Sequence, residues 1–391
     1  MTVLLLAVIY LAFVSLGLPD SVLGSAWPAM YDAFSVSLSA AGIISMITSG
    51  CTILSSLFSE RLIRRLRIRT ILTVSILLTS GAMFAFSFAG AFWVLCICAV
   101  PYGLGAGAVD ASLNHYVAAH YSARHMNWLH CFWGVGTILS PYIVSLALTH
   151  GGWQSGYRTV GFIQLGIALV VMASAPLWKK QAAVSGSGKE SGSVIGIRGA
   201  LRIPGVPPAL FGFFCYCAAE ATCMLWASSY LIRTHGFSTE KAAAFGSLFF
   251  IGLTAGRFLA GFLPAKLQDT VRILVGAAVA VSGAVLLCIP NLPASAVIAG
   301  LIVIGFGCAP VYPSIIHNTP IQFGQENAKA VIGIQMASAY VGSTFVPPLF
   351  GLIAERVGTN YMPLFAGLFL ALMALSILLS VQLTRSSASE L

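Results

Sequence analysis

Apolar stretches of ~20 residues recur from one end of this chain to the other, and each is long enough to cross a ~30 Å hydrocarbon core as a helix. Inside lipid the backbone must satisfy its own hydrogen bonds, so repeated segments of this length fold as helices. A β-barrel would instead show alternating segments of about ten residues. The sequence therefore predicts an all-α membrane protein with many spans.

The apolar segments and the charges between them predict twelve spans with both termini in the cytoplasm. Only 8% of the 391 residues are charged, against about 25% in soluble chains. Four of the 20 basic residues fall outside (Arg158, Arg233, Lys241 and Arg356) and the other 16 inside, as the positive-inside rule requires. The net charge of +9 therefore reflects topology, and we expect no nucleic-acid partner. The predicted spans are 3–29, 38–59, 69–90, 93–119, 129–149, 156–178, 206–232, 242–263, 271–289, 293–317, 330–354 and 361–383.

Several classes of protein are disfavoured by motifs that the sequence lacks. It has no GxxxxGK[ST], HExxH or GxSxG motif, so we expect neither an ATPase nor an enzyme. All nine cysteines lie in apolar segments, where they are expected to pack as small apolar residues, without a metal or a disulfide. The absence of an N-x-S/T sequon favours a bacterial plasma membrane. We expect no cofactor, and a monomer, because twelve spans around a central cavity need no partner chain.

An internal repeat divides the chain into two halves. Near the middle, the run AVSGSGKESGS has the composition of a flexible linker. The residues Gly103, Gly105, Ser112 and His115 recur 202 positions later as Gly305, Gly307, Ser314 and His317, and Asp20 is matched by Glu220. The sequence predicts a six-helix half over 1–178, a cytoplasmic linker over 179–205 and a second half over 206–391. Two pseudo-symmetric six-helix halves around a midplane site form the major facilitator architecture.

Three acids fall at membrane depth: Asp20 in span 1, Asp110 in span 4 and Glu220 in span 7. Charges there are costly, so each is a candidate for function, and no Lys or Arg is expected deep in a span beside them. A buried carboxyl without a cation can bind and release a proton near neutral pH, as proton coupling requires. The structural alternative is a neutral hydrogen-bonding role between helices.

The neighbours of these acids suggest where a solute binds. Gly103, Gly107, Asp110 and Asn114 share one helical face, where the glycines allow close approach of either a helix or a ligand. Amide side chains that can hold hydroxyl groups are Asn114, Gln164 and Gln335. Rings that can pack on a solute, or else lie at the membrane interface, are Trp27, Trp133, Tyr216, Trp226, Tyr312 and Tyr340.

A basic run follows the second span in the sequence FSERLIRRLRIR (58–69). Its main role is topological. A second interpretation is a cytoplasmic gate in which Glu60 pairs with Arg61, Arg65 or helix ends. Arg257 and Asp269 flank the equivalent loop of the second half.

Several segments resemble the major facilitator superfamily and, within it, the fucose–proton symporter family. GAGAVDASLNHYV (105–117) is similar to that family's fourth-span motif, which implies a coupling carboxylate at Asp110 with Asn114 as its companion. SLGLPDSVLGSAWP (15–28) resembles its first span with the acid Asp20, and YCAAEATCMLWASSYL (216–231) resembles the seventh span with Glu220. The 58–69 loop departs from the superfamily's usual Gly and Asp-Arg pattern.

The resemblance implies a proton-coupled symporter for a sugar or sugar-like solute, working by alternating access. Sodium coupling stays open, because a carboxylate and nearby carbonyls can bind either ion. An efflux antiporter for hydrophobic molecules is the first alternative, since it would use the same fold and acids. A solute sensor is the second alternative, although sensors usually carry a sizeable soluble domain.

Overall fold

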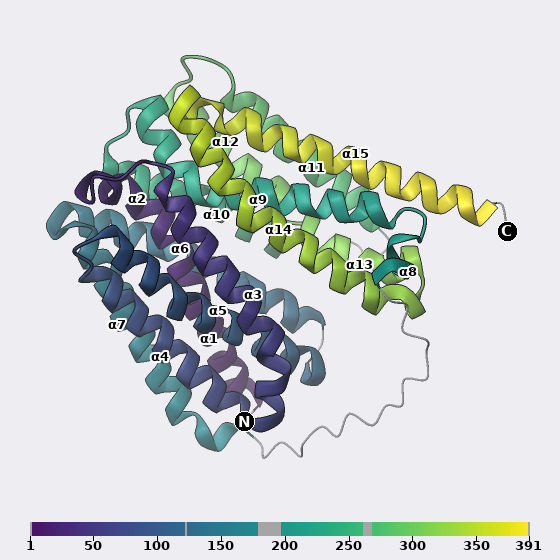
Figure 1. Cartoon of the computed structure of the whole chain (residues 1–391), viewed down its shortest axis with the longest axis horizontal. Helices are drawn as coiled ribbons and strands as arrows, with labels where there is room; N and C mark the ends of the chain where they lie inside the picture. Colours follow the sequence, from purple (N-terminus) through teal and green to yellow (C-terminus); the bar gives the residue numbers. More distant parts are fainter. Residues whose placement is uncertain (1, 122, 179–196, 261–267, 390–391) are drawn as a thin grey trace. The chain divides into compact units, whose positions relative to one another are not determined.

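The computed structural model describes residues 2–121, 123–178, 197–260 and 268–389, and this part of the chain is all-helical (Figure 1). Its α-helices are α1 (Thr2–Asp20), α2 (Val22–Ala33), α3 (Ala40–Arg65), α4 (Ile68–Ser87), α5 (Phe92–His120), α6 (Ala123–His150), α7 (Gly152–Ala173), α8 (Ile197–Leu201), α9 (Val206–His235), α10 (Thr239–Ala260), α11 (Asp269–Leu287), α12 (Ala294–Cys308), α13 (Val311–Phe323), α14 (Gln325–Val357) and α15 (Met362–Ser389). Two short 3₁₀ turns, Ala175–Leu177 and Thr359–Tyr361, complete the described elements.

Twelve segments of the described chain are long and apolar enough to cross a membrane, which confirms the predicted number of spans. The largest difference from the predicted ends is in span 10, which continues to Phe323 instead of 317. A helix does not stop where its hydrophobic stretch stops, because the backbone ladder can extend past the hydrocarbon core. The predicted linker lies mostly outside the described residues, and the division into halves stays a prediction.

Span 1 is interrupted in the middle, at Ser21 between α1 and α2. Pro19 lacks an N–H and so removes one bond from the helical ladder just before this break. Hydroxyl groups tie the break to α6, because Ser21 Oγ donates to the Thr137 carbonyl at 2.9 Å and Ser140 Oγ donates to the Leu18 carbonyl. The interruption therefore keeps its backbone groups bonded inside the membrane.

Span 10 is interrupted as well, between the end of α12 at Cys308 and the start of α13 at Val311. Pro310 is the N-cap residue of α13. An N–H group at this position would have no acceptor within the helix, so the proline costs the helix no hydrogen bond. Spans 1 and 10 are thus each built from two shorter helices.

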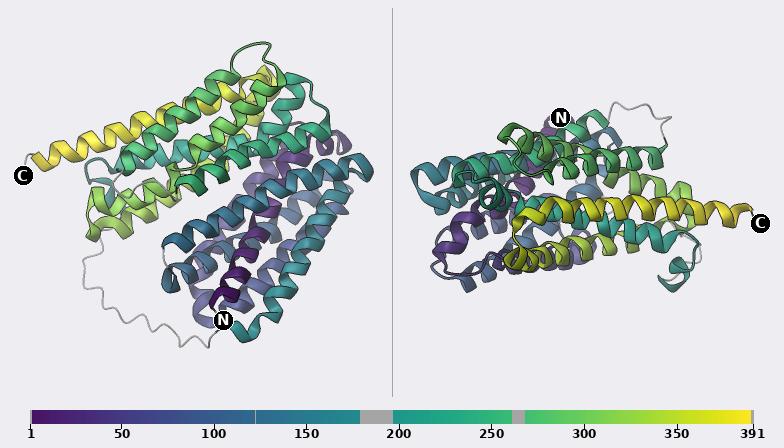
Figure 2. Two further views of the ribbon diagram at one scale, coloured as in Figure 1. Left: turned by 180° about the vertical axis from the view of Figure 1, so that it is seen from behind. Right: turned by 90° about the horizontal axis from the view of Figure 1, so that it is seen from above.

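The chain divides into two compact units. Unit 1 holds Met1–Gly186, Met224–Ile251 and Gly351–Thr359, and unit 2 holds Ser187–Cys223, Gly252–Phe350 and Asn360–Leu391. In unit 1, α1 packs on α6, α3 and α4 pack on α5, and α4 runs beside α7 (Figure 1). In unit 2, α11 packs on α12, α13 and the long unbroken α15 (Figure 2).

Glycines set the closest helix crossings in both units. A Cβ on Gly17 of α1 would overlap the Trp133 carbonyl of α6, so the two backbones touch there. Gly103 and Gly107 of α5 likewise face the carbonyls of Thr48 and Thr52 on α3. Of the two interpretations of this glycine face, the structure shows close helix packing.

Candidate functional site

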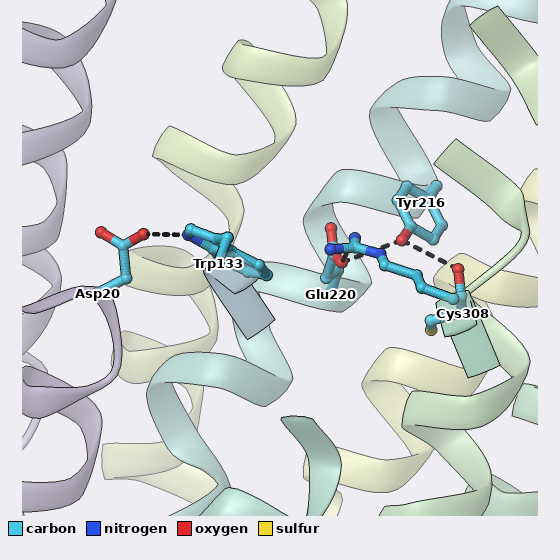
Figure 3. A network of polar contacts seen from close by, with 6 residues as sticks. Asp20, Trp133, Tyr216, Glu220 and Cys308 are labelled. Carbon is cyan, nitrogen blue, oxygen red and sulfur yellow. Dashed lines mark hydrogen bonds and ion pairs between the residues drawn. The ribbon is translucent and has the colours of Figure 1, made fainter. Parts of the chain in front are cut away.

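Asp20 is the last residue of α1, so its carboxyl group lies at the break in span 1. Tyr102 of α5 donates its hydroxyl to Asp20 Oδ1 at 2.6 Å, and Trp133 of α6 donates its indole N–H to Oδ2 at 2.7 Å. Figure 3 shows the contact with Trp133. Both donors are neutral, so they orient the carboxylate without cancelling its charge.

Replacing Tyr102 by Phe is expected to destabilise unit 1 by about 1.5–3 kcal/mol, because it removes a buried hydrogen bond to a charged group. The effect should appear as a lower Tm of the purified protein in detergent. The exposed Tyr142 of α6 provides the matched control, since Tyr142→Phe deletes the same hydroxyl at a site 40% exposed. Equal Tm values for the two variants would show that Tyr102 does not support Asp20.

Asp110 lies two-thirds of the way along α5 and shares its carboxylate with Asn114, one turn further on. The Asn114 amide donates to Asp110 Oδ1 at 2.8 Å and to the Asp110 carbonyl at 3.0 Å. The pair predicted from the family resemblance is therefore in contact. Asp110 stands on the same helix as Tyr102, the residue whose hydroxyl donates to Asp20. Among the described residues, neither acid has a cationic partner within ion-pair distance.

Glu220, in the middle of α9, has different surroundings. Its Oε1 lies 3.3 Å from Nη2 of Arg257 on α10, and both side chains are 14% exposed. The Tyr216 hydroxyl lies 3.0 Å from Glu220 Oε1 and 3.1 Å from the carbonyl oxygen of Cys308, at the end of α12 (Figure 3). The expectation that no Lys or Arg lies beside an intramembrane acid is thus wrong for Glu220.

The sequence predicts that Arg257 flanks a cytoplasmic loop at the end of a span, but in the structure it lies within α10, three residues before Ala260, and its side chain reaches sideways to α9. Sequence position gives the depth of a Cα atom and not the reach of a long side chain. Asp269, its predicted gate partner, instead pairs with His317 at 2.6 Å and Arg272 at 3.5 Å. Arg61 and Arg65 are exposed on α3, and the side chain of Glu60 lies outside the described part.

The remaining predicted residues are mostly packed inside their own unit. Gln164 is fully buried and donates to the Ser15 carbonyl at 2.8 Å and to Thr79 at 3.2 Å. Gln335 is 1% exposed and accepts from Thr319 at 2.8 Å. Both amides therefore hold helices together in this structure.

The predicted aromatic residues also differ in their surroundings. Trp27 is fully buried and donates to the Leu38 carbonyl at 2.7 Å, and Trp226 is fully buried beside Gly351. Tyr312 is half-buried and packs edge-on against Phe213, and Tyr340 is half-buried. Trp133 and Tyr216 each bring a polar ring atom into contact with an acid, Asp20 and Glu220 respectively.

Tyr102 was missed from the sequence, although it is as close to Asp20 as Trp133 is. It lies in an apolar run of α5, where an aromatic residue is expected to pack against other helices. Its position eight residues before Asp110, on a neighbouring part of the same helix surface, was the available signal.

Comparisons with known proteins agree with this architecture. The model of the Major Facilitator Superfamily matches residues 9–345. Bypass of stop codon protein 6 of Saccharomyces cerevisiae (strain ATCC 204508 / S288c) is 24% identical over 401 residues, covering 93% of this chain and 79% of that protein. The crystal structure of FucP, a Major Facilitator Superfamily transporter in the outward conformation, matches with a TM-score of 0.65 and 17% identity, over 96% of this chain and 98% of that chain. A family match across most of the sequence, together with twelve apolar helices, shows that this multi-pass membrane protein belongs to the Major Facilitator Superfamily of transporters.

Proposed function

We propose that this protein is a proton-coupled symporter that moves a sugar-like solute by alternating access between two six-helix halves. The environment of Asp20 carries the proposal. Its carboxyl group lies at membrane depth, at a helix break, and the donors on its two oxygens among the described residues, Tyr102 and Trp133, are neutral. An ionised carboxylate that lacks a cation in such a place is costly, and taking up a proton removes that cost.

Asp110 gives the proton a second site in the same unit. It stands on α5, the helix whose Tyr102 donates to Asp20, so both acids are tied to the same helix of unit 1. Asn114 links this site to a solute, since its amide bonds Asp110 and is half-buried on the same helix. A solute hydroxyl that takes over this amide would change the environment of Asp110, which is the link that coupling needs.

The solute is proposed to contact a half-buried polar group of unit 1, the amide of Asn114. Gln164 acts in this proposal by joining α7 to α1, the helix that carries Asp20, and Gln335 acts by joining α14 to α13. The sugar class rests on the resemblance to the fucose–proton symporter family, together with the likeness in fold to the transporter FucP. A hydroxyl-rich solute also suits groups that both donate and accept hydrogen bonds.

The experiment is uptake of labelled fucose, glucose and galactose into proteoliposomes under an inward proton gradient, with a sodium gradient in parallel. Accumulation of one sugar under the proton gradient, abolished by a protonophore, is the expected result. Accumulation under the sodium gradient alone would identify sodium, and not the proton, as the coupling ion. Extrusion of lipophilic cations, with no sugar moved under either gradient, would replace the proposal by an efflux antiporter.

A further inference from the structure

The acids of the two halves correspond in the internal repeat but have chemically different partners. Glu220 stands 200 positions after Asp20. Asp20 receives hydrogen bonds from a phenol and an indole, whereas Glu220 receives one from the Tyr216 phenol and forms an ion pair with Arg257. An arginine side chain stays protonated at any physiological pH, so its charge beside Glu220 is permanent.

The position of Arg257 is built into the helix packing of unit 2. Gly252 and Gly256, one helical turn apart on α10, lie directly on the backbone of α12. A Cβ on Gly256 would meet the Ala309 Cβ at 2.5 Å, and one on Gly252 would overlap the Ile302 carbonyl. This contact holds α10 against the end of α12, where Tyr216 binds the Cys308 carbonyl. The backbone of α10 that carries the Arg257 side chain is therefore held in place by its packing on α12.

The other titratable groups around Glu220 do not change the charge balance. Among the residues that the structure describes, they are Tyr216, Cys217 and Cys223 on α9 and Cys308 on α12. Phenols and thiols in apolar surroundings are uncharged near neutral pH. Among the described residues, the charges of this cluster are the Glu220 carboxylate and the Arg257 guanidinium, and a proton on Glu220 would end their attraction inside the membrane.

We propose that Arg257 keeps Glu220 permanently ionised, so that Glu220 recognises a neutral, hydroxyl-bearing solute while the transported proton is exchanged in unit 1. The inference rests on the proposed function. Of the three acids that the sequence offers for proton coupling, it leaves Asp20 and Asp110 and removes Glu220. A neutral ion pair offers a guanidinium donor and carboxylate acceptors side by side, which suits a sugar hydroxyl. It adds no net charge, so an anionic sugar acid gains nothing from it.

The first test needs no solute. The full chain is reconstituted in lipid, and the infrared C=O band of protonated carboxyl groups is followed as pH is lowered. Glu220→Gln should leave the pH-dependent band unchanged, whereas Asp20→Asn and Asp110→Asn should each weaken it. Loss of band intensity in Glu220→Gln would overturn the proposal, whether or not any sugar is transported.

The second test uses the partner residue. Glu220→Gln and Arg257→Gln each remove one charge of the pair and keep the other, so each should lower the Tm, and the double variant should recover part of the loss because it removes both. A double variant whose Tm falls by the sum of the two single losses would contradict a permanent pair. This comparison also separates charge balance from simple misfolding.

The third test addresses recognition. With the sugar that the wild type accumulates, Glu220→Gln should raise KM by about tenfold, as for one lost hydrogen bond to a charged group. The steady-state accumulation ratio under a proton gradient should stay at the wild-type value. A variant that exchanges sugar normally but no longer accumulates it would make Glu220 a proton carrier. Failure of the wild type to move any sugar would instead count against the proposed function.

Discussion

Asp110→Asn is expected to abolish uphill accumulation of the transported sugar while leaving exchange of labelled for unlabelled sugar in place. The substitution preserves shape, and an Asn oxygen at position 110 still accepts the Asn114 amide that now bonds Oδ1 at 2.8 Å. What disappears is the ability to bind and release a proton. Exchange between equal pools requires no net proton movement, so only the coupled step should fail.

The measurement is the ratio of internal to external sugar in proteoliposomes under an imposed pH gradient. In the variant this ratio should settle at equal concentrations on both sides. Asp32→Asn is the matched control, because it makes the same chemical change at an exposed position near the end of α2 and should accumulate like the wild type. A normal ratio in Asp110→Asn would remove Asp110 from the coupling mechanism.

Gly17→Ala is expected to destabilise the protein by about 3 kcal/mol, the upper end for overpacking a close-packed site. The added Cβ would overlap the Trp133 carbonyl, which is backbone and cannot rotate away. Helix α6 must then move off α1, and the indole of Trp133 moves with it. The variant should therefore lose the bond to Asp20 and, with it, most proton-driven uptake.

Gly166→Ala provides the comparison for this variant. It adds the same methyl group on α7, where a Cβ would meet nothing within 4 Å. In a helix this change should be neutral or slightly stabilising, because Ala has the higher helix propensity. The two variants would be compared by Tm in detergent and by uptake. Similar Tm values would mean that α1 and α6 can separate without cost.

The spans could be predicted because a hydropathy profile depends only on the length of each apolar segment. In this chain, polar residues clearly separate one apolar segment from the next. The breaks at Ser21 and between Cys308 and Val311 could not, since both lie inside apolar segments. They are accompanied by bonds from side chains to backbone groups, such as the one that the Ser21 hydroxyl donates to the Thr137 carbonyl on a helix far away in sequence. The spacing of apolar and polar residues within one segment does not predict a hydrogen bond to another helix.

The acids of the candidate site could be predicted for a similar reason, because a charge in an apolar segment is conspicuous. Their partners were predictable only when they lay one helical turn away, as Asn114 does from Asp110 and Tyr216 does from Glu220. Tyr102 and Arg257 reach their acids from other helices, across 82 and 37 positions. Those contacts depend on which helices pack side by side, which the linear sequence does not display.

The interruption of span 1 has a mechanical consequence. A continuous helix is a stiff rod, so a tilt at one membrane surface is transmitted to the other. Span 1 lacks that continuity at Ser21, next to Asp20, and is joined there to α6 by side-chain hydroxyls. The helices α1 and α2 can therefore tilt separately, and Asp20 lies where they join. A tilt of one helix in one leaflet of the bilayer can displace Asp20 without an equal tilt of the other helix.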